Sequence, residues 1–497
     1  MSGNGAQDPE QRLRSGLSRL DIVLLIALTL LGGAVRFISL ADPGELVFDE
    51  TYYAKDACMY VAGDIETCKL EAAQAEVHPP LGKWLIAGGI RFFGFDPFGW
   101  RVAVALAGTI TIALLYLLAL RLFSSTLGAA LSAFLLATDF LHVVQSRTSM
   151  LDIFLPMFGV AALLFVVLDR DRPEGAGREW RLAAGIAAGA ATATKWSGAP
   201  YLVAAFVLIV ASEVSRRRRD QQDDAYRSVL KEEGTSILVC LVVVPLLVYL
   251  VTYIARVDGS VFALPWAEGS WLRNIWDSQH SMLQFHRELS STHSYQSPPW
   301  SWLLLKRPVS YYFDTANNGD YKEVLALGNP IVWWSSILAL AYTAFRLVRT
   351  RDLRGPEGFI IIGFALTYGP WLLPFVSRSV VFLFYLLPAV PFMCLALGYV
   401  GTQIGDMWEA RAAQALFVAA TLGLFAFYYP LLTKRALPKD SWNARLLIFE
   451  GEKACAKPTD GPVTTETVTE TVSGELSTQI KRTQKTDDLP PVGWCWI

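Results

Sequence analysis

The feature that most constrains this chain is a series of long apolar segments. A helix that spans a bilayer needs about 20 predominantly apolar residues, because it rises about 1.5 Å per residue. The 497-residue chain is 53% hydrophobic and 18% charged, which predicts an all-α polytopic membrane protein rather than an ordinary soluble one. The eleven predicted segments are Asp21–Leu40, Gly99–Leu120, Ser124–Leu141, Ser149–Leu168, Arg181–Thr194, Ala199–Val214, Ser236–Ile254, Pro330–Phe345, Gly358–Phe375, Val380–Val400 and Ala412–Tyr429.

The fifth and sixth segments come from one long stretch. Between Arg181 and Arg216 only Lys195 and Glu213 are charged. The stretch is too long for one span, so we expect two helices that turn at Lys195–Gly198. The first of them is rich in Gly and Ala, which favours close helix packing.

Basic residues predict the orientation, since Lys and Arg concentrate on the cytoplasmic side. Residues 1–20 carry Arg12, Arg14 and Arg19 and are expected inside, before a membrane domain over 21–430. Exterior loops then cover 41–98 and 255–329, and the tail 431–497 lies outside. The other clusters expected inside are at Arg121, Arg170–Arg181, Arg216–Arg219 and Arg346–Arg354.

The exterior regions contain polar and aromatic stretches. Pro80–Phe93 predicts a short amphipathic helix, and the Trp-rich loop 255–329 predicts interfacial helices. The Thr-rich stretch Val463–Thr471 alternates like a strand, so the small tail is expected to hold some β-structure.

Four of the six cysteines fall in the exterior regions. Cys58 and Cys68 share the first loop, whereas Cys455 and Cys495 share the tail. Disulfides form in such a compartment, so we hypothesise the bridges Cys58–Cys68 and Cys455–Cys495, with free thiols as the alternative.

Ionisable residues gather on the predicted exterior side. Such residues at membrane depth are functional candidates. Plainer interpretations exist: Arg101 could be an interfacial anchor, Asp152 could interact with a helix N-terminus or pair with Arg147, and Asp49 and Glu50 could be solvated loop acids. No histidine spacing predicts a metal site. The candidates are Asp49, Glu50, His78, Lys83, Arg101, Arg147, Asp152, Lys195 and Arg378.

This mixture of acids and cations is typical of group transfer from a phosphate. A carboxylate can accept a proton from a hydroxyl nucleophile, and cations can stabilise a departing phosphate. No nucleotide-binding motif is present, which favours a donor carried on a lipid. The net charge of −2 gives no indication of nucleic-acid binding.

Six motifs resemble those of the bacterial protein O-mannosyltransferases, which belong to the membrane glycosyltransferase class GT-C, and the resemblance is to the actinobacterial type. They occur in the family's order over most of the membrane core. The motifs are Phe48–Tyr53 (FDETYY), His78–Lys83 (HPPLGK), Arg101, Arg147–Asp152 (RTSMLD), Thr194–Gly198 (TKWSG) and Ser377–Pro391.

The resemblance implies inverting transfer of mannose from polyprenyl phosphomannose to Ser or Thr of exported proteins. These would be acted on in extended form, as they leave the translocation channel of a bacterial plasma membrane. Asp49 would be the general base, and Glu50 would shape the acceptor site. Arg101, Lys195 and Arg378 would bind the donor phosphate. His78, Lys83, Arg147 and Asp152 would support the site. The resemblance implies no clear need for a catalytic metal, and a role for a divalent ion stays open.

Two departures distinguish the chain from eukaryotic relatives. Residues 255–329 are too few to hold the β-trefoil MIR domain that those relatives insert there. Phe384 and Tyr385 stand where a histidine pair often occurs, which puts a histidine contact to the phosphate in doubt.

Two other functions stay open. A GT-C enzyme that moves another lipid-linked sugar, such as aminoarabinose, onto a lipid or glycan would need the same acids and cations. A transporter is a further alternative, but the polar residues gather at one face and no matched pair of broken helices is evident.

Overall fold

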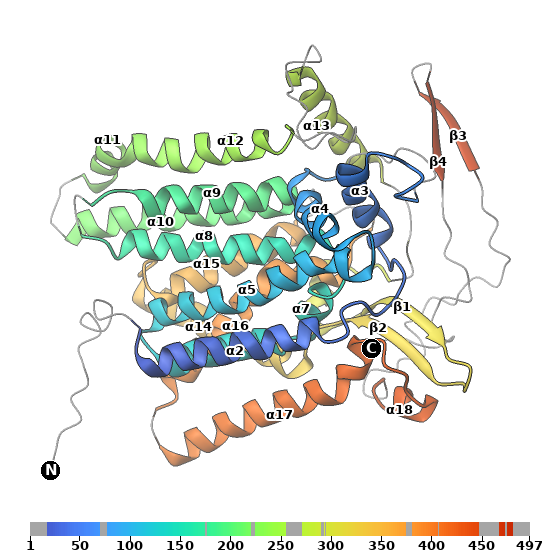
Figure 1. Ribbon diagram of the computed structural model, residues 1–497. Coiled ribbons are helices and arrows are strands. Elements are labelled where there is room, and N and C mark those ends of the chain that lie inside the picture. Colours follow the sequence, from blue (N-terminus) through green and yellow to red (C-terminus); the bar gives the residue numbers. More distant parts are fainter. Residues whose placement is uncertain are drawn as a thin grey trace.

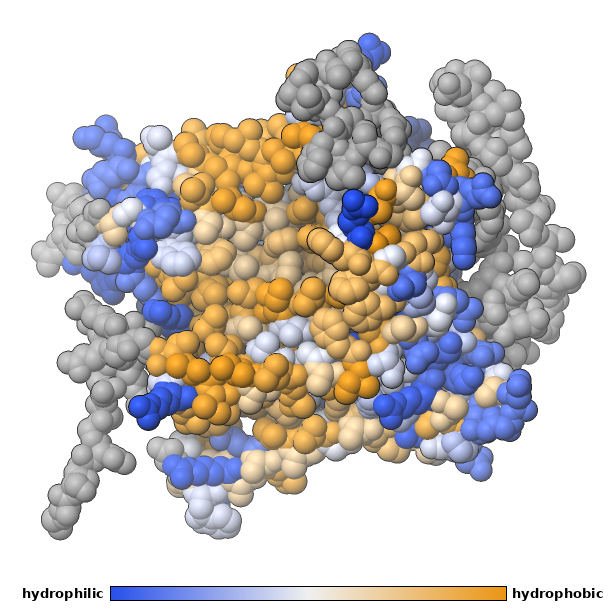
Figure 2. Space-filling view, viewed as in Figure 1, coloured by the Kyte–Doolittle hydropathy of each residue, from blue (hydrophilic) through white to orange (hydrophobic). Residues whose placement is uncertain are grey.

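The computed structural model describes residues 17–69, 77–173, 176–219, 224–254, 271–289, 293, 295–373, 380–405, 407–446, 467–472 and 475–480. Long helices run side by side as a bundle, and short helices and a β-hairpin gather at one end of it (Figure 1). An apolar band covers the middle of the bundle surface, with polar residues toward both ends (Figure 2).

Every predicted apolar segment corresponds to a helix or to consecutive helical pieces. Within the described ranges, eight helices are long and apolar enough to cross a membrane, whereas those of the third, fifth and ninth segments are shorter. The bundle elements are α2 (Arg19–Phe37), α5 (Pro97–Phe123), α6 (Thr126–Ala137), α8 (Phe154–Arg170), α9 (Glu179–Thr194), α10 (Ala199–Arg219), α11 (Ala225–Leu238), η3 (Val239–Val243), α12 (Val244–Val251), α14 (Pro330–Thr350), α15 (Pro356–Tyr368), α16 (Val390–Gln403) and α17 (Trp408–Leu432).

Local sequence signals set several of the helix starts. Ser18 and Asp21 form a reciprocal capping box at the start of α2. The Asp96 side chain accepts a hydrogen bond from the Gly99 amide, and Pro97 occupies the first turn of α5. Asn329 caps α14 in the same way.

The Gly-rich helix α9 packs closely, as its composition predicts. A Cβ atom at Gly185 would lie 1.8 Å from the carbonyl oxygen of Cys240 in η3. Any larger residue would therefore push the two helices apart.

The end of the bundle that holds the α8–α9 and α10–α11 turns contains an ion-pair network. Arg181 is fully buried and contacts Asp169, Glu213 and Glu233 at 3.0, 2.9 and 2.7 Å. Arg178 contacts the same three carboxylates. Because each buried charge has several partners of opposite sign, the network joins α8, α9, α10 and α11.

The opposite end of the bundle carries the longer connecting segments, which contain the short helices and the β1–β2 hairpin. The first of these contains α3 (Glu50–Ala62) and α4 (Leu81–Phe93), and α4 confirms the short helix predicted over Pro80–Phe93. The other short elements are α7 (Phe140–Gln145), η1 (Leu151–Ile153), η2 (Trp196–Gly198), α13 (Trp271–Glu288), η5 (Pro299–Leu304), η6 (Gly369–Leu372), η7 (Leu383–Ala389) and α18 (Lys439–Asn443).

The loop 255–329 departs from the prediction of helices alone. It contains α13 but also an antiparallel hairpin of β1 (Val309–Thr315) and β2 (Tyr321–Ala326). The hairpin packs through β2 against α7 and α17, and Tyr321 pairs with Leu437 of the tail. The tail strands β3 (Thr467–Val472) and β4 (Glu475–Ile480) pair with each other, which agrees with the alternation in the Thr-rich stretch.

The hairpin is fixed in part by a buried acid. Glu323 of β2 is 1% exposed and accepts a hydrogen bond of 2.8 Å from the indole of Trp442 in α18. Burial raises the pKa of Glu323 to about 7. The carboxyl is therefore protonated in the folded protein at pH values where the unfolded chain has already lost the proton.

This difference predicts a pH-dependent stability. The folded state binds more protons than the unfolded state between about pH 4.5 and 7, so the contribution of Glu323 falls as pH rises through that window. Glu323→Gln should remove this dependence and raise the melting temperature more at pH 8 than at pH 5. Thermal unfolding of the purified protein at both pH values measures it. Glu45→Gln, at a carboxylate that is 63% exposed, is the control. An equal shift at both pH values would contradict the prediction.

Candidate active site

The first connecting segment is anchored by a buried ion pair. Glu50, the first residue of α3, and Arg101, in the first turns of α5, are both fully buried. The guanidinium Nε and Nη2 each donate to the Glu50 carboxylate at 2.7 Å. The same carboxylate accepts from the amides of Val47 and Ser149, at 3.0 and 2.7 Å. It therefore joins α3, α5 and the segment before η1.

The remaining donors of Arg101 go to the backbone of the same segment. Nη1 donates to the carbonyl groups of Leu40 and Pro43, and Nη2 donates to that of Glu45. With the two bonds to Glu50, all five N–H groups of the guanidinium are occupied. In this structure no N–H group of Arg101 is left for a ligand, and the expectation that Arg101 binds the donor phosphate stays a prediction. The interfacial-anchor alternative fails, since the side chain does not reach the surface.

Asp49 directly precedes this anchor. It occupies the N-cap position of α3, is half-buried, and its carbonyl accepts hydrogen bonds from the amides of Tyr52 and Tyr53. Phe48, the residue before it, has a positive φ of 49°. The backbone on both sides of Asp49 is thus held in one conformation.

A second charged pair lies at the start of η1 and the turn between α9 and α10. The Lys195 ammonium contacts both oxygens of Asp152, at 2.9 and 3.0 Å, and both side chains are buried. Lys195 also lies 4.8 Å from the ring centre of Tyr385. The sequence-based pairing of Asp152 with Arg147 is therefore replaced by a pairing with Lys195.

Tyr311 of β1 is a buried residue of the same region. Burial raises the pKa of Tyr311 well above its usual range, and the charges of Asp152 and Asp49 raise it further. The phenol oxygen accepts a 2.6 Å hydrogen bond from Gln145. Nothing in the sequence pattern indicated Tyr311, because it lies in a loop that was expected to be helical.

His78 lies just before α4, and Lys83 lies in its first turn, where α4 packs against α3. The Lys83 ammonium contacts Asp56 at 2.7 Å, and the disulfide Cys58–Cys68, present as hypothesised, ties α3 to the segment that follows it. The ring of His78 lies 5.9 Å from that of Tyr53 and 5.5 Å from that of His286 in α13. This group therefore connects α13 to the first loop.

Arg147 supports the end of α2. Its guanidinium donates to the carbonyl groups of Val35, Arg36, Ile38 and Ser39, at 2.7 to 3.2 Å. Carbonyls at a helix C-terminus lack intrahelical partners, so a buried cation there is favourable. Arg147 thus fixes the point where the chain leaves α2 and enters the first loop.

The remaining candidates of the sequence analysis are Arg378, the other four cysteines and a metal site. Arg378 and the pair Cys455–Cys495 fall outside the described residues. Cys240 and Cys394 are buried free thiols. Among the described residues, no group of three His, Cys, Asp or Glu side chains is arranged to hold a metal ion.

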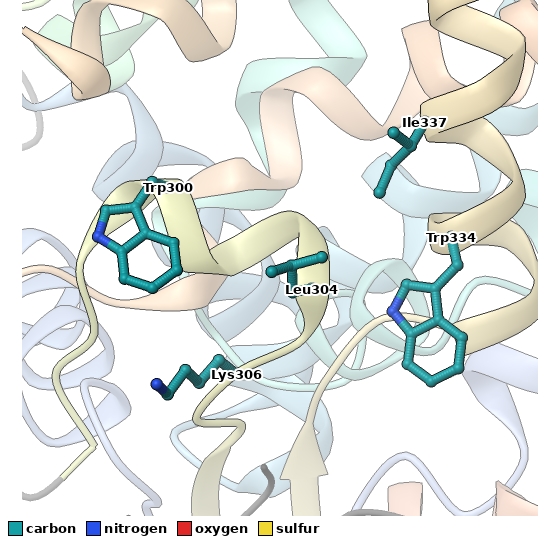
Figure 3. Close-up of a pocket in the computed structure, with 5 residues that line it drawn as sticks. All are labelled: Trp300, Leu304, Lys306, Trp334 and Ile337. Atoms are coloured by element: carbon teal, nitrogen blue, oxygen red, sulfur yellow. The ribbon is translucent and has the colours of Figure 1, made fainter.

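An apolar groove lies apart from the acids, between η5 and the start of α14. It has a volume of about 370 Å³ and is lined by Trp300, Leu304, Lys306, Trp334 and Ile337 (Figure 3). The Lys306 ammonium lies 5.7 Å from the Trp300 ring centre. Exposed tryptophans beside a cation are typical of a membrane interface.

Comparison with known proteins identifies the family. The description "Dolichyl-phosphate-mannose-protein mannosyltransferase" matches residues 26–100 and 77–249, and "C-terminal four TMM region of protein-O-mannosyltransferase" matches residues 271–449. The polyprenol-phosphate-mannose–protein mannosyltransferase of Mycobacterium tuberculosis (strain ATCC 25618 / H37Rv) is 30% identical over 476 residues, covering 84% of this chain and 90% of that protein. The chain belongs to the protein mannosyltransferase family.

Other members of the protein mannosyltransferase family align over similar lengths. Those of Mycolicibacterium smegmatis (strain MKD8) and Corynebacterium glutamicum are 29% and 28% identical, and they cover 84% and 85% of this chain. The protein is thus a membrane-embedded glycosyltransferase, as the sequence motifs implied.

Solved structures confirm the GT-C fold of this mannosyltransferase. The Saccharomyces cerevisiae Pmt1–Pmt2 complex bound to its sugar donor matches with a TM-score of 0.71, covering 88% of this chain and 93% of that one, at 16% identity. ArnT from Cupriavidus metallidurans bound to undecaprenyl phosphate matches with a TM-score of 0.52, covering 82% and 64% of the two chains, at 21% identity.

The ion pair at the first loop predicts a large stability effect. Arg101→Ala leaves the Glu50 carboxylate buried without its partner, which costs about 3–5 kcal/mol. We expect a marked fall in the melting temperature of the purified mannosyltransferase. Arg91→Ala, at an exposed arginine of α4, is the matched control and should melt like the wild type. A melting temperature for Arg101→Ala equal to that of the control would contradict the anchoring role.

Proposed function

We propose that the protein transfers mannose from polyprenyl phosphomannose to Ser and Thr hydroxyl groups of exported proteins, with inversion at the anomeric carbon. Family membership supports this reaction, since the names of the relatives give polyprenol phosphate mannose as the donor and protein as the acceptor. The observation that carries the proposal is an aromatic contact: Phe48, next to Asp49, and Tyr385, whose ring centre lies 4.8 Å from the Lys195 ammonium, both pack against Phe384. This packing brings a half-buried acid and a buried cation toward one site.

Asp49 is proposed as the general base. Its carboxylate accepts the proton of the acceptor hydroxyl, and the hydroxyl oxygen forms a bond to the anomeric carbon of mannose. The bond between that carbon and the phosphate oxygen breaks on the opposite face, and polyprenyl phosphate leaves with the electron pair. A carboxylate held by the rigid start of α3 is suited to this role because it needs little reorganisation during the reaction.

Lys195 is proposed to stabilise the leaving phosphate. It is a buried cation, and in the absence of donor Asp152 holds its ammonium group. A phosphate that approaches the lysine gains a charge-assisted hydrogen bond in a region of low dielectric. Arg378 is kept as a second proposed phosphate ligand on the strength of the motif resemblance. Glu50, His78, Lys83 and Arg147 support the site through the contacts described above.

The orientation is part of the proposal. The arginine clusters of the α8–α9 and α14–α15 turns share one end of the bundle, where Arg170 donates to the Arg354 carbonyl at 2.6 Å. The proposed site lies at the other end. Because basic residues favour the cytoplasmic side, the site is proposed to face the exterior of a bacterial plasma membrane, where exported chains emerge from the translocation channel in extended form.

Replacement of the proposed base tests the reaction. Asp49→Asn should lower kcat for transfer of radiolabelled mannose to a Ser/Thr-rich peptide by about 10²- to 10⁴-fold, because general-base catalysis contributes a factor of that size. Glu66→Gln, at an exposed acid of the same loop, should retain wild-type activity. Both variants should melt like the wild type. Full activity in Asp49→Asn would remove Asp49 from the role of base.

The phosphate-binding role of Lys195 gives a second test. Lys195→Gln should lower kcat/KM for the lipid donor by on the order of 10²-fold, because loss of one electrostatic stabiliser of a transition state has an effect of that size. The KM for the peptide should not change. Asp152→Asn keeps the lysine cation, so its kcat/KM for the lipid donor is expected to fall less than that of Lys195→Gln. If Asp152→Asn were the more damaged of the two, the carboxylate and not the lysine would be the functional group.

A further inference from the structure

The backbone before Asp49 adopts a conformation that its residue type disfavours. Phe48 has a φ of 49°, in the left-handed region that a bulky side chain rarely enters. Such a conformation persists only where the surroundings hold it, and it occurs preferentially at functional sites. The contacts of the Phe48 ring therefore indicate what keeps Asp49 in place.

The main contact is a stacked ring from the β1–β2 hairpin. The rings of Phe48 and Tyr311 lie 4.4 Å apart with an interplanar angle of 12°. Phe384 of η7 packs edge-on against both rings, at 5.8 Å from each. Phe382 and His293 contact Phe48 edge-on at 6.1 and 6.4 Å. Offset stacking and edge-on packing are the favoured geometries of aromatic pairs.

Tyr311 is itself fixed from the opposite side. Its hydroxyl accepts a hydrogen bond from Gln145 of α7 at 2.6 Å, and the residue is 4% exposed. Its ring plane therefore cannot turn without losing either this bond or the stack. A chain of contacts thus runs from α7 through Tyr311 and Phe48 to Asp49.

We propose that Tyr311 is a positioning residue of the transfer reaction, whose ring holds Phe48 in its left-handed conformation and thereby sets the direction of the Asp49 carboxylate. This inference rests on the proposed role of Asp49 as the base. It makes the β1–β2 hairpin part of the active site. A misplacement of about 1 Å at a reacting group can cost on the order of 10²-fold in rate, so the aromatic contact can affect turnover without touching substrate.

Three substitutions at position 311 separate the ring from the hydroxyl. Tyr311→Phe keeps the stacked ring and should stay within about threefold of the wild-type kcat, since only one hydrogen bond is lost. Tyr311→Leu, which fills space without stacking, and Tyr311→Ala should each lower kcat by about 10- to 100-fold, with KM for donor and peptide unchanged. Tyr312→Ala is the matched control on the same strand, at a residue that contacts Lys434 rather than Phe48.

A double variant tests whether Tyr311 acts through Asp49. Residues that act as a unit are non-additive, so Tyr311→Leu should cause little further loss in an Asp49→Asn background. Single-turnover transfer with excess enzyme measures the residual rates, and thermal unfolding checks that each variant is folded. A full additional loss in the double variant would overturn the proposal, as would equal losses for Tyr311→Phe and Tyr311→Leu.

The outcomes also separate this inference from the proposed reaction. A wild-type enzyme that transfers mannose, an inactive Asp49→Asn and a fully active Tyr311→Leu would leave the reaction standing and remove the positioning role. An active Asp49→Asn beside a slow Tyr311→Leu would overturn the role of Asp49 as the base, and with it the route through which Tyr311 is inferred to act.

Discussion

Glu50 and Arg101 bring opposite charges together where water is excluded, so neither can be removed without leaving the other unpaired. Their hydrogen bonds reach the turn after α2, the first loop and the segment before η1, and they join α3 to α5. The position of Asp49, next to Glu50 in the chain, depends on this anchor. Of the two adjacent acids, Glu50 is fully engaged in structural contacts. Asp49 is half-buried and is the acid proposed to react.

The buried charges of the bundle are paired in two ways. At the end with the α10–α11 turn, Arg181 and Arg178 share three carboxylates, so the charges balance within the protein. At the other end, Glu50 and Arg101 are fixed in a similar way, whereas Lys195 contacts the two oxygens of one carboxylate, Asp152, beside Tyr385. A network of many partners fixes the helices, whereas a single pair leaves a cation that a phosphate can engage.

Aromatic rings surround the proposed reacting groups. Phe384 and Tyr385 lie against Phe48 and Lys195 respectively. Apolar surroundings weaken solvent screening, so the few charges that remain interact more strongly. In the proposed site, aromatic packing therefore positions Asp49, and the low dielectric strengthens the attraction between Lys195 and a phosphate.

The sequence by itself determined the helical membrane fold, the short helix α4 and the family, because apolar length and motif order are local properties of the chain. It gave the Cys58–Cys68 bridge as a hypothesis beside free thiols, and the structure contains the bridge. The motif resemblance brought Asp49, Glu50, Arg101, Asp152 and Lys195 into one candidate set and implied a role for each, but it did not indicate which side chains contact one another. Only the tertiary structure showed that Arg101 has no free donor, that Lys195 pairs with Asp152, and that Tyr311 stacks on Phe48. Those facts depend on residues far apart in the chain, where neither spacing nor periodicity indicates which side chains meet.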